Sequence, residues 1–148
     1  MGSCWKKKFI NGVLQIKLSV GEIRVGYDVL NVSDGSYVPM VRHRAFLPRD
    51  WEEAFVLGEF SFSAPGIERA VNWIREGLNE KFPMVIDEVG PVEINGLGFY
   101  DVLTELFRGE TGVPEVYVIV RKRILGKMID TFGIKDKEYV LIDLDTIN

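Results

Sequence analysis

Residues 84–93, MVIDEVGPVE, join a short apolar run to two adjacent carboxylates. Met84 to Ile86 have the uniform apolar character of a parallel strand that is covered on both faces. Asp87 and Glu88 follow directly, and burying them without a partner would be costly. At the carboxyl end of a strand, however, they meet solvent and ligand. The stretch therefore predicts an α/β sheet whose chemistry lies at the carboxyl end of this strand.

The chain on either side of this stretch alternates helical and strand patterns. Apolar residues recur with helical spacing in residues 63–81, 99–106 and 124–132. Short apolar runs typical of buried strands occupy residues 116–120 and 139–144. Strand, helix, strand, helix, strand with short connections predicts a parallel sheet with right-handed crossovers.

The N-terminal part of the chain has a β-rich pattern. Apolar residues alternate in residues 12–19 and 23–32, and a glycine turn separates the two runs, which predicts a hairpin. Residues 37–41 form a third predicted strand, expected at a sheet edge because Pro39 cannot donate a ladder hydrogen bond. Residues 57–62 add a short fourth strand.

Composition predicts one domain over residues 1–148. The net charge of -4 gives no chain-wide attraction to nucleic acid or anionic lipid, so we expect neither nucleic acid nor membrane as a partner. A single cysteine, Cys4, cannot form an internal disulfide, and no signal peptide or long apolar span is present. These features favour a cytoplasmic protein. His43, the only histidine, cannot build a metal site alone.

Asp87 and Glu88 have the chemistry of a magnesium-dependent phosphate site. One carboxylate can hold Mg²⁺ directly or through water, and the second can position an attacking water. Neighbouring residues on a strand point to opposite sides, which favours separate roles. Arg121 and Arg123 follow the strand at 116–120 and could reach a phosphate near Asp87. The alternative for both groups is a solvated turn.

The string from Val85 to Glu93, with Phe99 opening a helix, resembles the Ile-Asp-Glu-Ile-Gly-x-Met-Glu signature of the thermophile-type nucleoside-triphosphatases. In animals these proteins are also called cancer-related nucleoside-triphosphatases. Residues 24–29 resemble that family's Arg-x-Gly-Phe-Asp-Ile strand, and residues 116–121 lie where the family has a strand. The resemblance runs from about Gly12 to the end of the chain.

The resemblance implies a P-loop-NTPase-like three-layer α/β sandwich, with a mostly parallel sheet and an N-terminal antiparallel hairpin. It also implies slow, magnesium-dependent hydrolysis of nucleoside triphosphates. Carried over by position, Asp87 is the magnesium-side Walker B carboxylate and Glu88 the water-orienting acid. Glu93 is a loop carboxylate without an assigned role.

The 148 residues contain no Walker A string, Gly-x-x-x-x-Gly-Lys-Ser/Thr, which supplies most of the triphosphate grip. Residues 1–8 have glycine and lysines at the wrong spacing. In the family the strand before this loop is central, next to the Walker B strand. Either the N-terminal hairpin takes its place, or a second chain supplies the strand and perhaps the loop. We therefore expect a protein partner or homo-oligomer to complete the sheet.

Two other functions stay open at this point. The chain could be a non-catalytic subunit or interaction module that keeps the fold without activity. It could also be an unrelated hydrolase that uses Asp87 and Glu88 as general acid and base on a small phosphate compound.

Overall fold

The computed structural model describes residues 9–134 and 139–142. Within these residues one sheet has the strand order β4-β5-β3-β2-β1-β6-β7. The strands are β1 Asn11–Val20, β2 Ile23–Asn31, β3 Tyr37–His43, β4 Glu53–Leu57, β5 Phe60–Ser63, β6 Met84–Val89 and β7 Val116–Val120. The helices are α1 Ala64–Gly77, α2 Pro91–Ile94, α3 Tyr100–Phe107 and α4 Lys122–Phe132, with a 3-10 turn at Arg44–Phe46.

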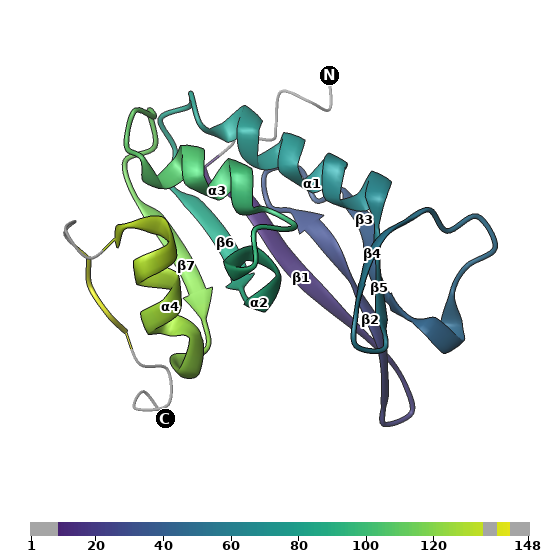
Figure 1. Ribbon diagram of the computed structural model, residues 1–148. Helices are drawn as coiled ribbons and strands as arrows, with labels where there is room; N and C mark the ends of the chain where they lie inside the picture. The colour runs from purple at the N-terminus through teal and green to yellow at the C-terminus, as the bar shows by residue number, and fades with distance from the viewer. Residues whose placement is uncertain (1–8, 135–138, 143–148) are drawn as a thin grey trace, which may run out of the picture.

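The helices α1, α2, α3 and α4 pack on the same face of the sheet (Figure 1). The core lies between these helices and the sheet, where Ala70, Ile74, Met84, Ile86 and Leu103 are fully buried. The expected α/β class and N-terminal hairpin are confirmed. The third layer of the expected sandwich is not among the described residues, since their helices cover one face only.

The strand β6 pairs in parallel with both of its neighbours, β1 and β7. Every other neighbouring pair in the described sheet is antiparallel. The sheet is therefore mixed rather than mostly parallel. The hairpin strand β1 occupies the place beside β6, with Asn11 opposite Met84 and Val13 opposite Ile86. Gly12 permits this close approach, because a Cβ there would lie 1.9 Å from the Val85 carbonyl oxygen.

The strand β3 is internal, lying between β2 and β5, and not at the edge that Pro39 predicted. Pro39 faces Asp28 where the register of β2 against β3 shifts between Tyr27 and Asp28. A residue without an N–H is tolerated at such a bulge. The predicted strand at 57–62 is instead the end of β4, a tight turn and most of β5.

The helices begin and end close to the predicted limits. The Oγ of Ser63 accepts a hydrogen bond from the N–H of Gly66 at 3.0 Å and caps α1, which ends at Gly77 rather than near Lys81. The short helix α2 was not predicted. No helix in the described part of the chain is long and apolar enough to cross a membrane.

The last predicted strand, over residues 139–144, is not found in the part of it that the structure describes. Residues 139–142 lie outside any strand, and their side chains are 55% to 87% exposed. Residues 143 and 144 lie outside the described residues. The apolar run is typical of a strand, but a strand also needs a neighbouring strand to pair with.

Candidate functional site

The acidic pair Asp87–Glu88 lies in a bulge of β6. The register of β6 against β7 shifts between Ile86 and Val89, so β6 has two residues where β7 has one. Glu88 has a φ of 61°. This left-handed conformation costs a non-glycine residue about 1–2 kcal/mol. Because the bulge interrupts strand alternation, both residues line one pocket, whereas the sequence predicted opposite sides.

Asp87 joins β6 to β1 through its side chain. Its Oδ2 accepts a hydrogen bond from the backbone N–H of Gln15 at 2.9 Å. Gln15 lies just beyond the last β1–β6 pair, Val13 with Ile86, so the carboxylate takes an N–H that the ladder no longer satisfies. No donor among the described residues reaches Oδ1 of Asp87, which leaves this oxygen available to a ligand.

Glu88 is paired with Arg121, the residue that follows β7. The Nε and Nη2 atoms of Arg121 each lie 3.1 Å from Oε1 of Glu88. The side chains are 60% and 24% exposed, respectively. An exposed pair of this kind contributes about 1 kcal/mol or less. The structure therefore brings together two residues that the sequence singled out, at the edge of the sheet where ligands bind in such folds.

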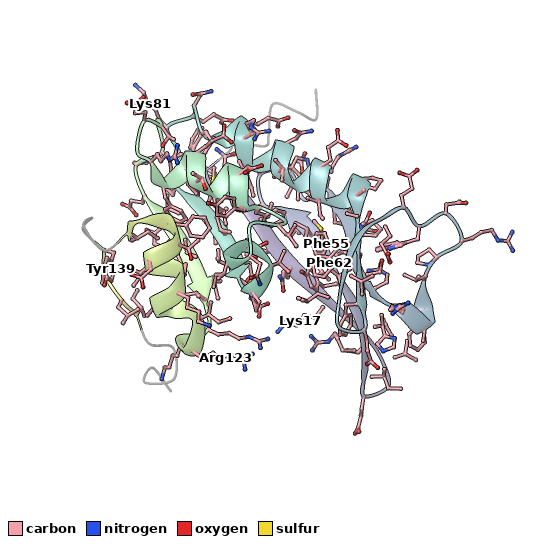
Figure 2. All side chains as sticks on the ribbon, viewed as in Figure 1. Lys17, Phe55, Phe62, Lys81, Arg123 and Tyr139 are labelled. Carbon is pink, nitrogen blue, oxygen red and sulfur yellow. The ribbon has the colours of Figure 1, made fainter. Side chains whose placement is uncertain are left out.

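Arg123 lies in the first turn of α4 and is exposed. No contact joins Arg123 to Asp87 or Glu88 in the part of the chain that the structure describes. Figure 2 shows Arg123 near the beginning of α4. Of the two predicted phosphate-binding residues, only Arg121 is placed against the acidic pair.

Glu93 is buried and holds together the loop that follows β6. Its Oε1 accepts from the N–H of Gly90 at 3.0 Å, and its Oε2 accepts from the N–H of Phe99 at 3.3 Å. Burial raises the pKa of Glu93 to about 7, although the backbone hydrogen bonds lower it. This carboxylate had no assigned role in the sequence, and here it ties both ends of residues 90–99 together.

Tyr27 of β2 is a pocket residue that sequence reasoning missed. Burial raises the pKa of its hydroxyl, and the negative charges of Glu93, Glu88 and Asp87 raise it further. Its alternation with Val25 and Val29 indicated a core position, so only the hydroxyl itself could have pointed to the site.

The pocket lies between the sheet and the loop after β6. Its cavity volume is about 20 Å³, and it is partly open to solvent. That is room for about one water. The polar side chains around it are Gln15, Tyr27, Asp87, Glu88 and Glu93.

Asp87 fits a magnesium site in which the substrate and water supply most of the ligands. Among the described residues no group of three or more His, Cys, Asp or Glu side chains is arranged to hold a metal ion. Magnesium, however, is usually held by one or two carboxylates together with water and substrate phosphates. The Asp87 carboxylate, which has one oxygen on the Gln15 N–H and a second oxygen that no described donor reaches, suits that donor set.

Comparison with known proteins assigns the chain to a family. A family model described as NTPase matches residues 5–148. The chain belongs to this NTPase family. The membership confirms the resemblance seen in the sequence and leaves the alternative of an unrelated hydrolase without support.

The nucleoside-triphosphatase THEP1 of Methanopyrus kandleri is a relative of this chain. The two are 23% identical over 110 residues, which cover 74% of this chain and 56% of the relative. The chain therefore spans little more than half the length of that protein.

Two solved structures share the fold of this chain. The crystal structure of THEP1 from the hyperthermophile Aquifex aeolicus has a TM-score of 0.62 and 17% identity, over 93% of this chain and 76% of that one. The solution structure of a human cancer-related nucleoside triphosphatase has a TM-score of 0.56 and 20% identity, over 82% and 68%. These likenesses confirm the P-loop-NTPase-like fold.

Proposed function

We propose that this chain binds a nucleoside triphosphate with Mg²⁺ at the carboxyl ends of β6 and β7, and hydrolyses it once its phosphate grip is complete. The observation that carries this proposal is the contact between Arg121 and Glu88, directly beside Asp87. A carboxylate for the metal (Asp87), a carboxylate for the water (Glu88) and a cation for the phosphate (Arg121) then lie at one edge of the sheet.

Each side chain has a separate role in this proposal. Asp87 holds the magnesium ion through Oδ1, while its Oδ2 stays on Gln15. The ion, when bound, neutralises charge on the phosphate oxygens. Glu88 orients the attacking water. Arg121 moves from Glu88 to a phosphate oxygen, and Arg123 adds a second basic contact from α4.

In this proposal the remaining hydrogen-bond donors to the phosphates come from a second chain, either a separate partner or another copy. Within the described sheet both flanks of β6 are occupied, so an added strand can enter next to this site only at the outer edge of β7. That strand, VYVIV, carries no charge, and Tyr117 and Ile119 are 50% and 41% exposed. An uncharged exposed edge of this kind is a template for strand addition.

A second candidate is a non-catalytic interaction module that keeps the fold. The exposed apolar residues at 139–142 favour it, because they offer an apolar surface suited to a protein partner. In that case the acidic pair stabilises the bulge through Gln15 and Arg121, and no nucleotide is turned over.

Isothermal titration with a nonhydrolysable nucleoside triphosphate analogue and magnesium separates the two candidates. Saturable binding that Asp87→Ala weakens and Asp101→Ala leaves unchanged supports the nucleotide site, since Asp101 is an exposed acid on α3. Absence of heat from the chain alone at high ligand concentration, and again after the partner is added, rejects the nucleotide site and favours the interaction module.

Sedimentation velocity over a range of concentrations tests self-association at β7. We expect Ile119→Lys to abolish any association, while Val56→Lys, on the other edge strand β4 and 39% exposed, leaves it unchanged. A wild-type chain that stays monomeric throughout eliminates a second copy as the source of the strand.

A further inference from the structure

The left-handed backbone of Glu88 has to be held in place, because a non-glycine residue keeps such a conformation only where its surroundings fix it. Its φ is 61°. The side chain of Glu88 contacts Arg121, whose own side chain is 60% exposed. In the proposed mechanism Arg121 leaves Glu88 for a phosphate oxygen. The conformation of Glu88 is then held only through its neighbours in the chain.

The residues on either side of Glu88 are anchored to neighbouring strands. Before it, Oδ2 of Asp87 accepts a hydrogen bond from the backbone N–H of Gln15 on β1 at 2.9 Å. After it, Val89 is buried and pairs with Val120 of β7. The strand β6 ends at Val89, so the chain that follows depends on contacts of another kind.

The carboxylate of Glu93 supplies such a contact. Glu93 is buried, and its Oε1 accepts a hydrogen bond at 3.0 Å from the N–H of Gly90, the residue directly after β6. Its Oε2 accepts from the N–H of Phe99 at 3.3 Å. A Cβ on Gly98 would lie 2.5 Å from Oε2, so the loop leaves this carboxylate little room to move. Both oxygens therefore fix backbone next to the bulge that carries Glu88.

We propose that Glu93 is a positioning residue that fixes the backbone at Gly90 and thereby keeps Glu88 in the conformation that orients the attacking water. This inference rests on the proposed function. Glu93 acts through Gly90 and Glu88 and contacts neither the metal nor the phosphate. An acid that is positioned in advance needs no reorganisation during the reaction. The binding of nucleotide by Asp87 and Arg121 does not depend on Glu93.

Two substitutions of Glu93 change its contact with Gly90 to different degrees. Glu93→Gln keeps an acceptor for the Gly90 N–H, whereas Glu93→Ala removes it. Ser63→Ala is the matched control, because it also removes a buried side-chain acceptor of a backbone N–H, in this case that of Gly66. Ser63 does not line the pocket.

Turnover and nucleotide affinity are measured for the folded wild type and variants, with the partner present if the chain needs one. Glu93→Ala should lower kcat about ten- to a hundredfold, as misplacement of a reacting group does, with affinity changed by less than about twofold. Glu93→Gln should retain most of the wild-type kcat, and Ser63→Ala should change neither quantity. Equal kcat in Glu93→Ala and Ser63→Ala overturns the proposal.

Glu93→Asp gives a comparison that stands even where Glu93→Ala does not fold. It keeps the negative charge but shortens the side chain, so the carboxylate withdraws from the Gly90 N–H. We expect Glu93→Asp to lower kcat more than Glu93→Gln does. The reverse order would show that the charge of Glu93 matters rather than its contact with Gly90, and it would overturn the proposal.

Crystal structures of the wild type, Glu93→Gln and Glu93→Asp provide a readout that does not depend on turnover. We expect a positive φ at Glu88 in the wild type and in Glu93→Gln, and its loss in Glu93→Asp. A positive φ that persists in Glu93→Asp overturns the proposal. Failure of the wild type to bind nucleotide rejects the proposed function instead, and the crystal structures still decide whether Glu93 holds the bulge.

Discussion

Two nitrogen atoms of Arg121 lie 3.1 Å from a single oxygen of Glu88, and this contact joins the end of β7 to the bulge in β6. Both nitrogens share Oε1, so the pair lacks the two parallel bonds of the strongest Arg–carboxylate contacts. A guanidinium held this loosely and 60% exposed is available to a stronger anion.

Arg121→Ala should therefore weaken binding of a nucleoside triphosphate analogue by about tenfold or more, because a hydrogen bond to a charged group contributes about 1.5–3 kcal/mol. The control is Arg75→Ala, which removes another exposed ion pair, Arg75 with Glu105 at 2.8 Å. Isothermal titration of both variants gives the comparison. Equal affinities for the two would show that Arg121 does not contact phosphate.

Asp87 combines a structural role with a ligand role, and two substitutions separate them. Asp87→Asn keeps an acceptor for the Gln15 N–H, whereas Asp87→Ala leaves that N–H without a partner. Urea denaturation should show a loss of about 1–3 kcal/mol for alanine and less for asparagine. Both should lose magnesium-dependent nucleotide binding. If the Asp87→Asn variant bound nucleotide as the wild type does, the proposed role of Asp87 in holding Mg²⁺ would be wrong.

Glu93 should make the free energy of unfolding depend on pH near neutrality. Its pKa is about 7 in the folded protein against an ordinary value of 4.5, so between these values the folded state holds a proton that the unfolded state has released. Stability should therefore fall as pH rises from about 4.5 to about 7. Urea denaturation at about pH 5 and about pH 8 measures the difference.

Glu93→Gln, which cannot ionise, should remove most of this pH dependence. Glu76→Gln, at an exposed position on α1, should leave it in place. A pH profile that Glu93→Gln leaves unchanged would assign the dependence to another group.

Gly98 and Gly96 form a matched pair in the loop that Glu93 ties together. Both have positive φ, +60° and +80°, so alanine costs about 1–2 kcal/mol of backbone strain at either position. A Cβ on Gly98 would also lie 2.5 Å from Oε2 of Glu93, whereas nothing lies within 4 Å of one on Gly96. Thermal or urea unfolding should find Gly98→Ala less stable by about a further 1–3 kcal/mol. Equal losses would indicate that the Glu93 carboxyl moves aside freely.

Local patterns in the sequence were sufficient for most elements of the fold. Apolar residues alternate in residues 12–19 and 23–32, and this pattern correctly predicted a hairpin. The strand β7 has the limits that were predicted. The position of Pro39 could not be predicted, because the bulge that tolerates it lies in the pairing with β2. Residues 139–142 could not be placed either, since strand formation depends on a neighbouring strand as well as on composition.

Part of the candidate site could also be predicted, because Asp87, Glu88 and Arg121 each directly follow a strand or end one. These residues lie close together because the parallel strands β6 and β7 are neighbours in the sheet. The bulge at Glu88 depends on the register between those strands, which no local pattern reports. The role of Glu93 and the place of Tyr27 in the pocket depend on burial and on neighbours from distant parts of the chain, so composition assigned them to a loop and to the core.

The bulge in β6 separates the residues of the site from those that build the sheet. Ile86 and Val89 keep their register against β7 and their buried positions on either side of the two extra residues. Asp87 and Glu88 are extra residues with respect to that ladder. Chemistry at these two positions can therefore change or disappear during evolution while the core stays intact, and members of such a family can keep one fold after their activities have diverged.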